Sequence, residues 1–341
     1  MVKKLISCLL CCGVLLPAAG CNPRYDKVTR SFEAMDTFMQ VELYNVDSIA
    51  LTGIQAQAEW YDKALSVTEA DSELNETRQL NAQGSKMMSP SLVETVRQTL
   101  ALCEETDGVL DVTVCPVVEA WGFYTKDYRV PSGQELDRLL PLVDYRQVTV
   151  DGEEVRFEKE GMKIDFGAVA KGRLADEMIA ILDKAGADSA ILNLGGTVAA
   201  YHEKPDGSLW RVGIADPDNS ASHMGSISCK DKVIATSGSY ERSFTGEDGK
   251  TYSHIIDPKT GVPVDNGILS VTIISDSGIR ADGLSTALFV MGREKAEEYR
   301  RAHPDFDYVI LTEDRKAYVT AGVSDSFKLA DGSDYETVLI K

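Results

Sequence analysis

The chain has 341 residues, of which 43% are hydrophobic and 26% are charged, values typical of a soluble globular protein. Its length predicts one large domain or two closely packed ones. The formal net charge is −19, which excludes proteins that hold nucleic acid or anionic lipid through a broadly basic surface. A polyphosphate ligand would therefore need a local positive site or a metal ion.

The N-terminal segment has the features of a bacterial lipoprotein signal. Two lysines precede an apolar run over residues 5–16, and small residues precede Cys21, as at a cleavage site. About twelve apolar residues are too few to span a bilayer. We therefore expect the mature protein in the bacterial cell envelope, outside the cytoplasm and lipid-anchored to a membrane. The expected division is a lipoprotein signal peptide over residues 1–20, a lipidated Cys21 within a tether over residues 21–29, and one folded domain over residues 30–341.

Three cysteines remain beyond this segment, Cys103, Cys115 and Cys229. Their scattered positions lack the paired spacing of a zinc site and do not form a disulfide framework. We expect them to be buried small residues.

Hydrophobic periodicity predicts strands and helices in the first half. Apolar residues alternate with polar ones over residues 37–43, which predicts a half-buried strand. Helical spacing predicts helices over residues 54–65 and 93–103. The turn signal Asp151-Gly152 between two short apolar runs predicts a hairpin over residues 148–157.

Two segments of this half combine small residues with functional ones. Trp121 and Phe123 flank Gly122, and two aromatic rings there either fill core or form a wall for a planar ligand. Residues 164–172 include Lys171 and predict a turn into a helix, where small residues and free N–H groups suit an anion. This segment is not a P-loop because Lys171 precedes the second glycine and no Ser or Thr follows. A plain strand-to-helix turn is the simpler interpretation of that pattern alone.

Short apolar runs separated by turns dominate the second half and favour an α+β layout over a regular βαβ succession. A charged helix is expected over residues 293–301. Strands are expected over residues 190–194, 210–214, 233–236, 308–311, 317–319 and 338–340.

The stretch over residues 253–263 has the highest density of chemically useful residues. Pro258 fixes its own φ and biases Asp257 away from helix, so a rigid turn through Gly261 should follow a short strand. The side chain of His254 would lie at the end of that strand. An ordered surface turn explains these residues equally well, because Asp-Pro and Thr-Gly are common in turns.

A helix is predicted over residues 281–292. Asp282 and Thr286 lie four residues apart and therefore share one face, opposite an apolar stripe. Asp282 is either an N-cap or first-turn acid, or a cation ligand with Thr286. Two oxygen ligands are too few for Mg²⁺, so main-chain, water or phosphate oxygens would have to complete the shell.

Seven of these segments, in this order, resemble the FAD:protein FMN transferases, the ApbE-type flavin transferases. The resemblance extends from about Met35 to Gly292 and implies one α+β catalytic body with a mixed sheet and packed helices. The matching segments are residues 71–75, 111–123, 164–176, 193–196, 235–242, 253–263 and 281–292.

The resemblance implies an extracytoplasmic enzyme that uses Mg²⁺ to transfer the FMN part of FAD, through a phosphoester, to a Ser or Thr hydroxyl of an acceptor protein and releases AMP. The acceptor would be a subunit of a membrane redox complex, and no nucleic acid is involved. By the same resemblance His254 is the general base. The implied Mg²⁺ ligands are Asp282, Thr286 and the main chain around Ala168. The implied FAD contacts are Met35, Trp121, Gly122, Phe123, Asp165, Lys171 and Ile255.

Two residues depart from the family pattern. Asp36 and Cys115 each stand where a glycine is common. Both would alter how closely the backbone approaches the flavin, and Met35 is the assignment that they weaken most. Three alternatives stay open: an FAD pyrophosphatase that uses water as the nucleophile, a non-enzymatic flavin-binding lipoprotein, and a thiamine-pathway role.

Overall fold

The computed structural model describes residues 25–77 and 84–341. The expected signal peptide and Cys21 lie outside these residues. None of the helices in the described ranges combines the length and apolar character needed to cross a membrane.

Within the described residues, nine strands form one mixed sheet in the order β1-β2-β6-β7-β10-β15-β16-β17-β19. Each neighbouring pair is antiparallel except β17 and β19, which are parallel. Alternating polarity places one side chain in two against the core, as in β2 (Thr37–Tyr44), where Met39, Val41 and Leu43 are buried. The other strands are β1 (Lys27–Ala34), β6 (Ser189–Asn193), β7 (Thr197–Tyr201), β10 (Lys232–Gly238), β15 (Ile268–Ser275), β16 (Asp307–Thr312), β17 (Lys316–Thr320) and β19 (Glu336–Ile340).

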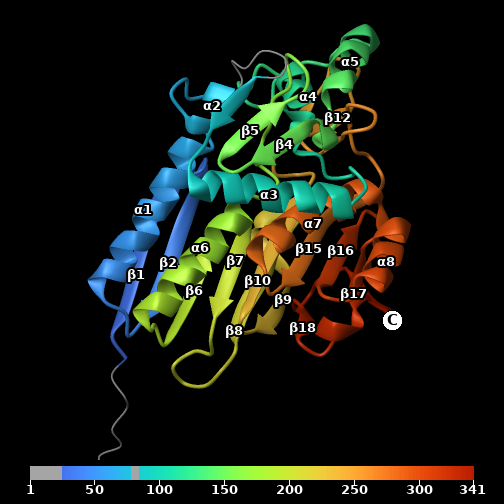
Figure 1. Ribbon diagram of the computed structural model, residues 1–341. Coiled ribbons are helices and arrows are strands. Elements are labelled where there is room, and N and C mark those ends of the chain that lie inside the picture. The colour runs from blue at the N-terminus through green and yellow to red at the C-terminus, as the bar shows by residue number, and fades with distance from the viewer. Residues whose placement is uncertain (1–24, 78–83) are drawn as a thin grey trace, which may run out of the picture.

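Helices cover one face of this sheet (Figure 1). The helices α1 (Ser48–Ala64), α6 (Ala170–Ala185) and α7 (Gly278–Met291) bury apolar residues against the strands in the main hydrophobic core. A smaller sheet, β18-β9-β8, packs on the opposite face and forms a second core. Its strands are β8 (Trp210–Asp216), β9 (Asn219–Cys229) and β18 (Phe327–Leu329).

The remaining elements lie around this body. A third sheet and a third apolar cluster, which contains Trp121, Phe123 and Ile256, lie beyond α3 in Figure 1. The strands are β3 (Ser85–Met87), β4 (Val148–Asp151), β5 (Glu154–Phe157), β11 (Ser243–Thr245), β12 (Thr251–Ser253), β13 (Ile256–Asp257) and β14 (Val262–Pro263). The helices are α2 (Glu73–Thr77), α3 (Pro90–Glu105), α4 (Cys115–Ala120), α5 (Gly133–Leu139) and α8 (Arg293–Ala302), and the 3-10 turns are η1 (Val112–Val114), η2 (Leu140–Leu142), η3 (Tyr145–Gln147) and η4 (Ala321–Val323).

The structure confirms the predicted α+β class, the mixed sheet and most of the predicted elements. Cys103, Cys115 and Cys229 are buried and free, as expected. The strand β1 begins at Lys27, so the last three residues of the expected tether belong to a strand.

The predicted helix start at residue 281 was wrong. The helix α7 begins at Gly278, after the N-cap Ser277, so Asp282 lies in its second turn and is not an N-cap.

Candidate active site

Two glycines bring helices α6 and α7 into direct backbone contact. A Cβ on Gly172 would lie 2.0 Å from the carbonyl oxygen of Gly278, and one on Gly278 would lie 2.1 Å from the carbonyl oxygen of Gly172. No larger residue fits at this crossing. The contact places the start of α6, including Lys171, against Asp282 of α7.

The carboxylate of Asp282 is buried at this crossing. Its Oδ2 accepts a hydrogen bond from the Gly172 amide at 2.8 Å, and its Oδ1 lies 3.4 Å from the Thr197 hydroxyl. Burial raises the pKa of Asp282, against the opposing effect of the Lys171 ammonium. Gly172 is the third residue of α6, so its amide has no partner within the helix and can donate to Asp282.

A group of hydroxyls lies one turn along α7 from Asp282. The Thr286 Oγ1 is 3.1 Å from the Ser237 Oγ, which is 2.7 Å from the Ser285 Oγ. These contacts join α7 to the end of β10. The oxygens of Asp282, Thr286 and Ala168 are the hard donors that Mg²⁺ prefers, but they are too few to fill its shell.

In the part of the chain that the structure describes, no group of three or more His, Cys, Asp or Glu side chains is arranged to hold a metal ion. A cation at Asp282 would thus need further oxygens, from main chain, water or a ligand.

The loop before α6 is organised by Asp165. Its Oδ1 accepts from the Gly167 amide at 2.7 Å, and its Oδ2 accepts from the hydroxyl of Tyr124. Burial, followed by the nearby Asp165 carboxylate, raises the pKa of Tyr124 well above its usual value, so the phenol keeps its proton. Asp165 therefore fixes the backbone from which Ala168 and Lys171 project.

The imidazole of His254 directly follows β12, at a strand end as predicted. The carbonyl of Arg242, just before β11, accepts from the His254 amide at 2.9 Å and lies 3.2 Å from Nδ1. An Nδ1–H donor to this carbonyl leaves Nε2 as the free basic nitrogen. Burial, and then the positive charges of Arg242 and Lys171, lower the pKa of His254 to about 4.

An aromatic cluster adjoins His254. The ring of Phe123 lies 6.4 Å from the imidazole and 5.8 Å from the ring of Phe244. Phe244 stacks on Tyr128 with ring centroids 5.0 Å apart and also contacts Tyr252. The cluster joins the loop after α4 to the β11–β12 hairpin.

The predicted contacts Trp121, Gly122 and Ile255 form the base of this region. The side chains of Trp121 and Ile255 are buried, and the indole Nε1 of Trp121 donates to the carbonyl of Gly261 at 2.8 Å. Gly122 has φ +78, and a Cβ there would lie 2.1 Å from the Asp127 carbonyl oxygen. These residues hold the turn before Pro263 against α4.

The hairpin turn between β1 and β2 carries Met35. Met35 and Asp36 have φ of 53 and 57, and Ala34 pairs with Thr37, so the turn is a two-residue type I′ turn. Asp36 thus adopts the left-handed conformation that usually selects glycine, which aspartate tolerates. Its carboxylate lies 3.9 Å from the guanidinium of Arg242, which places this turn beside the strand that leads to His254.

Lys171 connects the two halves of the site. Its positive charge lowers the pKa of Asp282 on α7, of His254 after β12 and of Glu241 after β10. For His254 burial is the larger cause and acts in the same direction. For the carboxyls of Asp282 and Glu241 the effect of burial is also larger than that of Lys171, but burial raises their pKa. Lys171 directly precedes Gly172, whose amide donates to Asp282.

Several residues of this region had no predicted role: Thr197, Ser237, Glu241, Arg242, Phe244 and Tyr252. The aromatic pair had a detectable signal. Phe244 and Tyr252 flank a turn with Asp248-Gly249 and occupy opposite positions of one hairpin. Ser237, Glu241 and Arg242 lie in the family-like segment 235–242 but had no individual role assigned, and Thr197 is defined by tertiary contact.

Comparisons with known proteins show the family of this chain. The ApbE family profile matches residues 35–310. The FAD:protein FMN transferase of Vibrio cholerae is 32% identical over 295 residues, which cover 84% of this chain and 88% of that protein. That of Treponema pallidum is 30% identical and covers 95% of this chain and 94% of its own.

Solved structures show the same fold. The flavin transferase ApbE from Vibrio cholerae aligns with a TM-score of 0.76 and 29% identity, over 90% of this chain and 97% of its own. The ApbE protein from Thermotoga maritima aligns with a TM-score of 0.77 and 28% identity, over the same shares. The fold and its relatives define a transferase enzyme. The chain belongs to the ApbE family.

Proposed function

We propose that this enzyme transfers the FMN part of FAD to a Ser or Thr hydroxyl of an acceptor protein, with Mg²⁺ as cofactor and AMP as the leaving product. The observation that carries the proposal is a series of contacts that connects Asp282 to His254. The Thr197 hydroxyl lies at Asp282, the neighbouring Gly196 lies beside the Glu241 side chain, and the carbonyl of the next residue, Arg242, holds His254. A dinucleotide pyrophosphate would lie within reach of the acid, the amine and the base together.

Each part of the site has a separate task in this reaction. Lys171 would neutralise charge on the phosphate oxygens, where it develops during transfer. Mg²⁺, held by Asp282, Thr286 and the Ala168 carbonyl, would supply Lewis-acid stabilisation of the same oxygens. Met35, Phe123 and the turn that contains Ile255 would position the flavin end.

His254 would accept the proton of the acceptor hydroxyl. The hydroxyl oxygen forms a bond to the phosphorus of FMN, the bond from that phosphorus to AMP breaks, and the proton passes to Nε2. The Arg242 carbonyl supports this role because it holds Nδ1 and keeps Nε2 free. A neutral imidazole is available over the whole neutral pH range.

The decisive experiment separates transfer from its alternatives. The protein is incubated with FAD, Mg²⁺ and a candidate acceptor domain, and intact masses and free nucleotides are measured. A covalent gain of FMN on the acceptor supports transfer. Free FMN without labelled acceptor would indicate a pyrophosphatase, and unchanged FAD would indicate a flavin-binding protein.

We also propose that the chain is a lipoprotein, acylated at Cys21 after removal of residues 1–20, and anchored outside the cytoplasm. The acceptor would then be a subunit of a membrane redox complex. Mass spectrometry of the membrane-extracted protein tests the anchor, because it would detect an N-terminal acylated cysteine.

A further inference from the structure

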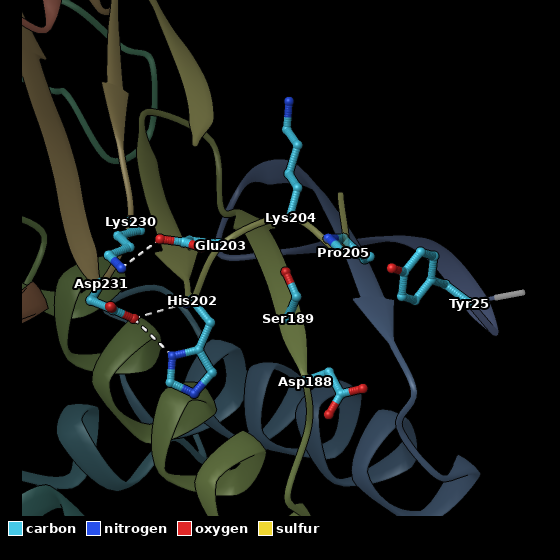
Figure 2. Close-up of a pocket in the computed structure, with 9 residues that line it drawn as sticks. All are labelled: Tyr25, Asp188, Ser189, His202, Glu203, Lys204, Pro205, Lys230 and Asp231. Atoms are coloured by element: carbon cyan, nitrogen blue, oxygen red, sulfur yellow. Dashed lines mark hydrogen bonds and ion pairs between the residues drawn. The ribbon is translucent and has the colours of Figure 1, made fainter. Parts of the chain in front are cut away.

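A pocket lies at one end of the sheet (Figure 2). The strand directions place it opposite to the candidate active site. Its volume is about 400 Å³. Ser189 begins β6 and Lys230 and Asp231 precede β10, whereas Thr197 and Ser237 lie at the active-site ends of β7 and β10. Because β10 has seven residues, the two ends are about 20 Å apart.

The lining of this pocket carries both signs of charge. Lys230 pairs with Glu203 at 2.6 Å, and Asp231 accepts from the backbone and ring of His202. The full lining is Tyr25, Asp188, Ser189, His202, Glu203, Lys204, Pro205, Lys230 and Asp231. A ligand with one anionic and one cationic group matches such a lining better than a simple anion does.

One hydroxyl in this lining has no hydrogen-bond partner among the described residues. Ser189 is 1% exposed and its Oγ is unsatisfied. Figure 2 shows it between Asp188, Glu203 and Pro205. Buried hydroxyls are nearly always hydrogen-bonded, so a water or a polar group of a ligand would complete the bonding of this one.

Exposed apolar side chains surround the same end. Tyr25 lines the pocket, Leu209 follows the pocket loop, and Ile49 lies in the first turn of α1, with 38%, 43% and 77% of their surfaces exposed. Asn45, just before α1, donates to Asp188 of the lining. Tyrosine, lysine and scattered aliphatic residues together are typical of surfaces that rest on a lipid headgroup layer.

The N-terminal chain enters the body at this end. Tyr25 lines the pocket and lies four residues after Cys21. Four residues span at most about 14 Å. A lipid on Cys21 would hold this end of the molecule against the membrane.

We propose that this end rests on a zwitterionic bilayer and that the pocket receives a phosphoethanolamine headgroup. The lysines would face its phosphate, and the carboxylates and the Ser189 hydroxyl its ammonium and ester oxygens. The net charge of −19 disfavours anionic lipid. The active site then faces away from the membrane. This inference rests on the proposed lipid anchor and not on the reaction.

Tryptophan quenching tests the orientation. The lipidated protein is placed in vesicles of phosphatidylethanolamine and phosphatidylcholine that contain a lipid with a nitroxide on its headgroup. The chain has three tryptophans. Trp210 lies beside Leu209, whereas Trp121 lies near His254 and Trp60 lies near the end of α1 that is far from Ile49. We expect quenching in the wild type and at least a twofold smaller effect in Trp210→Phe. Equal quenching of the two proteins, or failure to associate with vesicles, would overturn the proposal.

Paired variants test the surface and the pocket. Ile49→Asp with Leu209→Asp should lower the quenching to the level of Trp210→Phe, whereas Met87→Asp with Val130→Asp, exposed residues elsewhere, should not. We expect the wild type to be quenched more in vesicles that contain phosphatidylethanolamine than in pure phosphatidylcholine vesicles. Ser189→Ala should remove this difference. Ser270→Ala changes a buried serine at the active-site end of β15, far from the pocket, and should keep the difference.

Two further outcomes contradict the proposal. Equal quenching in both lipids would exclude the headgroup pocket. A detergent-stable dimer that the Ile49→Asp and Leu209→Asp pair dissociates would show that a second copy covers this face. FMN transfer to a soluble acceptor is measured in detergent with the same protein preparations, so failure of the proposed reaction is seen separately.

Discussion

At His254 the ring nitrogen that faces the Arg242 carbonyl is Nδ1, and this single contact selects the tautomer. His303 offers a matched comparison, because its Nδ1 also lies 3.0 Å from a backbone carbonyl, that of Tyr299. The two histidines therefore have similar local geometry but different surroundings. For His254 these surroundings include the positive charges of Arg242 and Lys171.

We expect His254→Ala to bind FAD normally and to lose transfer by roughly 100-fold or more, since general bases contribute about 10²–10⁴. His303→Ala should transfer at the wild-type rate. Single-turnover labelling of an acceptor measures both. Near-normal transfer by His254→Ala would remove His254 from the mechanism.

The pH profile gives an independent measurement. The pKa of His254 is lowered to about 4 from a usual value of 6.5, so the ring stays neutral and basic as the pH falls through 6.5. We expect the acidic limb of kcat/KM to have its midpoint near 4, in a plot from pH 3.5 to 8. A midpoint near 6.5 would contradict the structure.

The same shift affects stability. Below pH 6.5 the unfolded chain takes up a proton at His254 that the folded chain does not bind. The part of the folding stability that depends on a neutral His254 is therefore fully present above about pH 6.5 and is lost as the pH falls toward 4. Thermal unfolding at pH 7 and pH 5 should show a smaller decrease in Tm for His254→Ala than for the wild type.

Asp282 illustrates a conflict between stability and function. Burial raises its pKa, so its ionised form destabilises the fold. Asp282→Asn can still accept from the Gly172 amide, and we expect it to be more stable by about 0.5–2 kcal/mol. Metal-stimulated transfer should be abolished. Denaturant unfolding and a Mg²⁺ titration measure the two effects, and retained Mg²⁺ stimulation would exclude Asp282 as a ligand.

At the scale of elements, the crossing of α6 and α7 should tolerate no added atom. Gly172→Ala would place its Cβ 2.0 Å from the Gly278 carbonyl oxygen, and we expect a loss of about 1–3 kcal/mol and of transfer. Gly53→Ala in α1 is the control. Its Cβ would lie 3.7 Å from the Ile181 side chain, and it should stabilise by about 0.5–1 kcal/mol. Thermal unfolding of both variants tests this contact. Equal changes in Tm for the two variants would contradict it.

Helices and strands could be predicted from the sequence because apolar periodicity is a local property. The start of α7 could not be predicted, because the carboxylate that accepts from its first amides belongs to another helix. The carboxylate of Asp176 in α6 accepts from the amides of Gly278 and Ile279. A partner about a hundred residues away in the sequence leaves no local signal, so the helix was expected to begin too late.

At the scale of the whole molecule, the sequence predicted strands but not their order. Strand β10 pairs with β7 and β15, and β2 pairs with β6, which follows it by about 145 residues. Such pairings depend on the assembled core. The site was predicted only through the family resemblance for the same reason, since Lys171, His254 and Asp282 lie far apart in the chain.

Ligand binding should be cooperative across this body. The protein offers Mg²⁺ too few oxygens, and FAD phosphates would supply the rest. We expect Mg²⁺ and FAD together to raise the Tm by more than the sum of their separate effects. Thermal unfolding with each ligand alone, with both, and with EDTA measures this. Additive shifts would contradict a shared site.

The glycine crossing between α6 and α7 also constrains how this enzyme can diverge. The two helices meet through main chain at Gly172 and Gly278, so any side chain added at the crossing would force them apart and displace Asp282. Selection for another acceptor or nucleotide would have to act on the loops that carry Met35, Arg242 and His254. We therefore expect natural variation in specificity to accumulate in those loops while the helix crossing stays invariant.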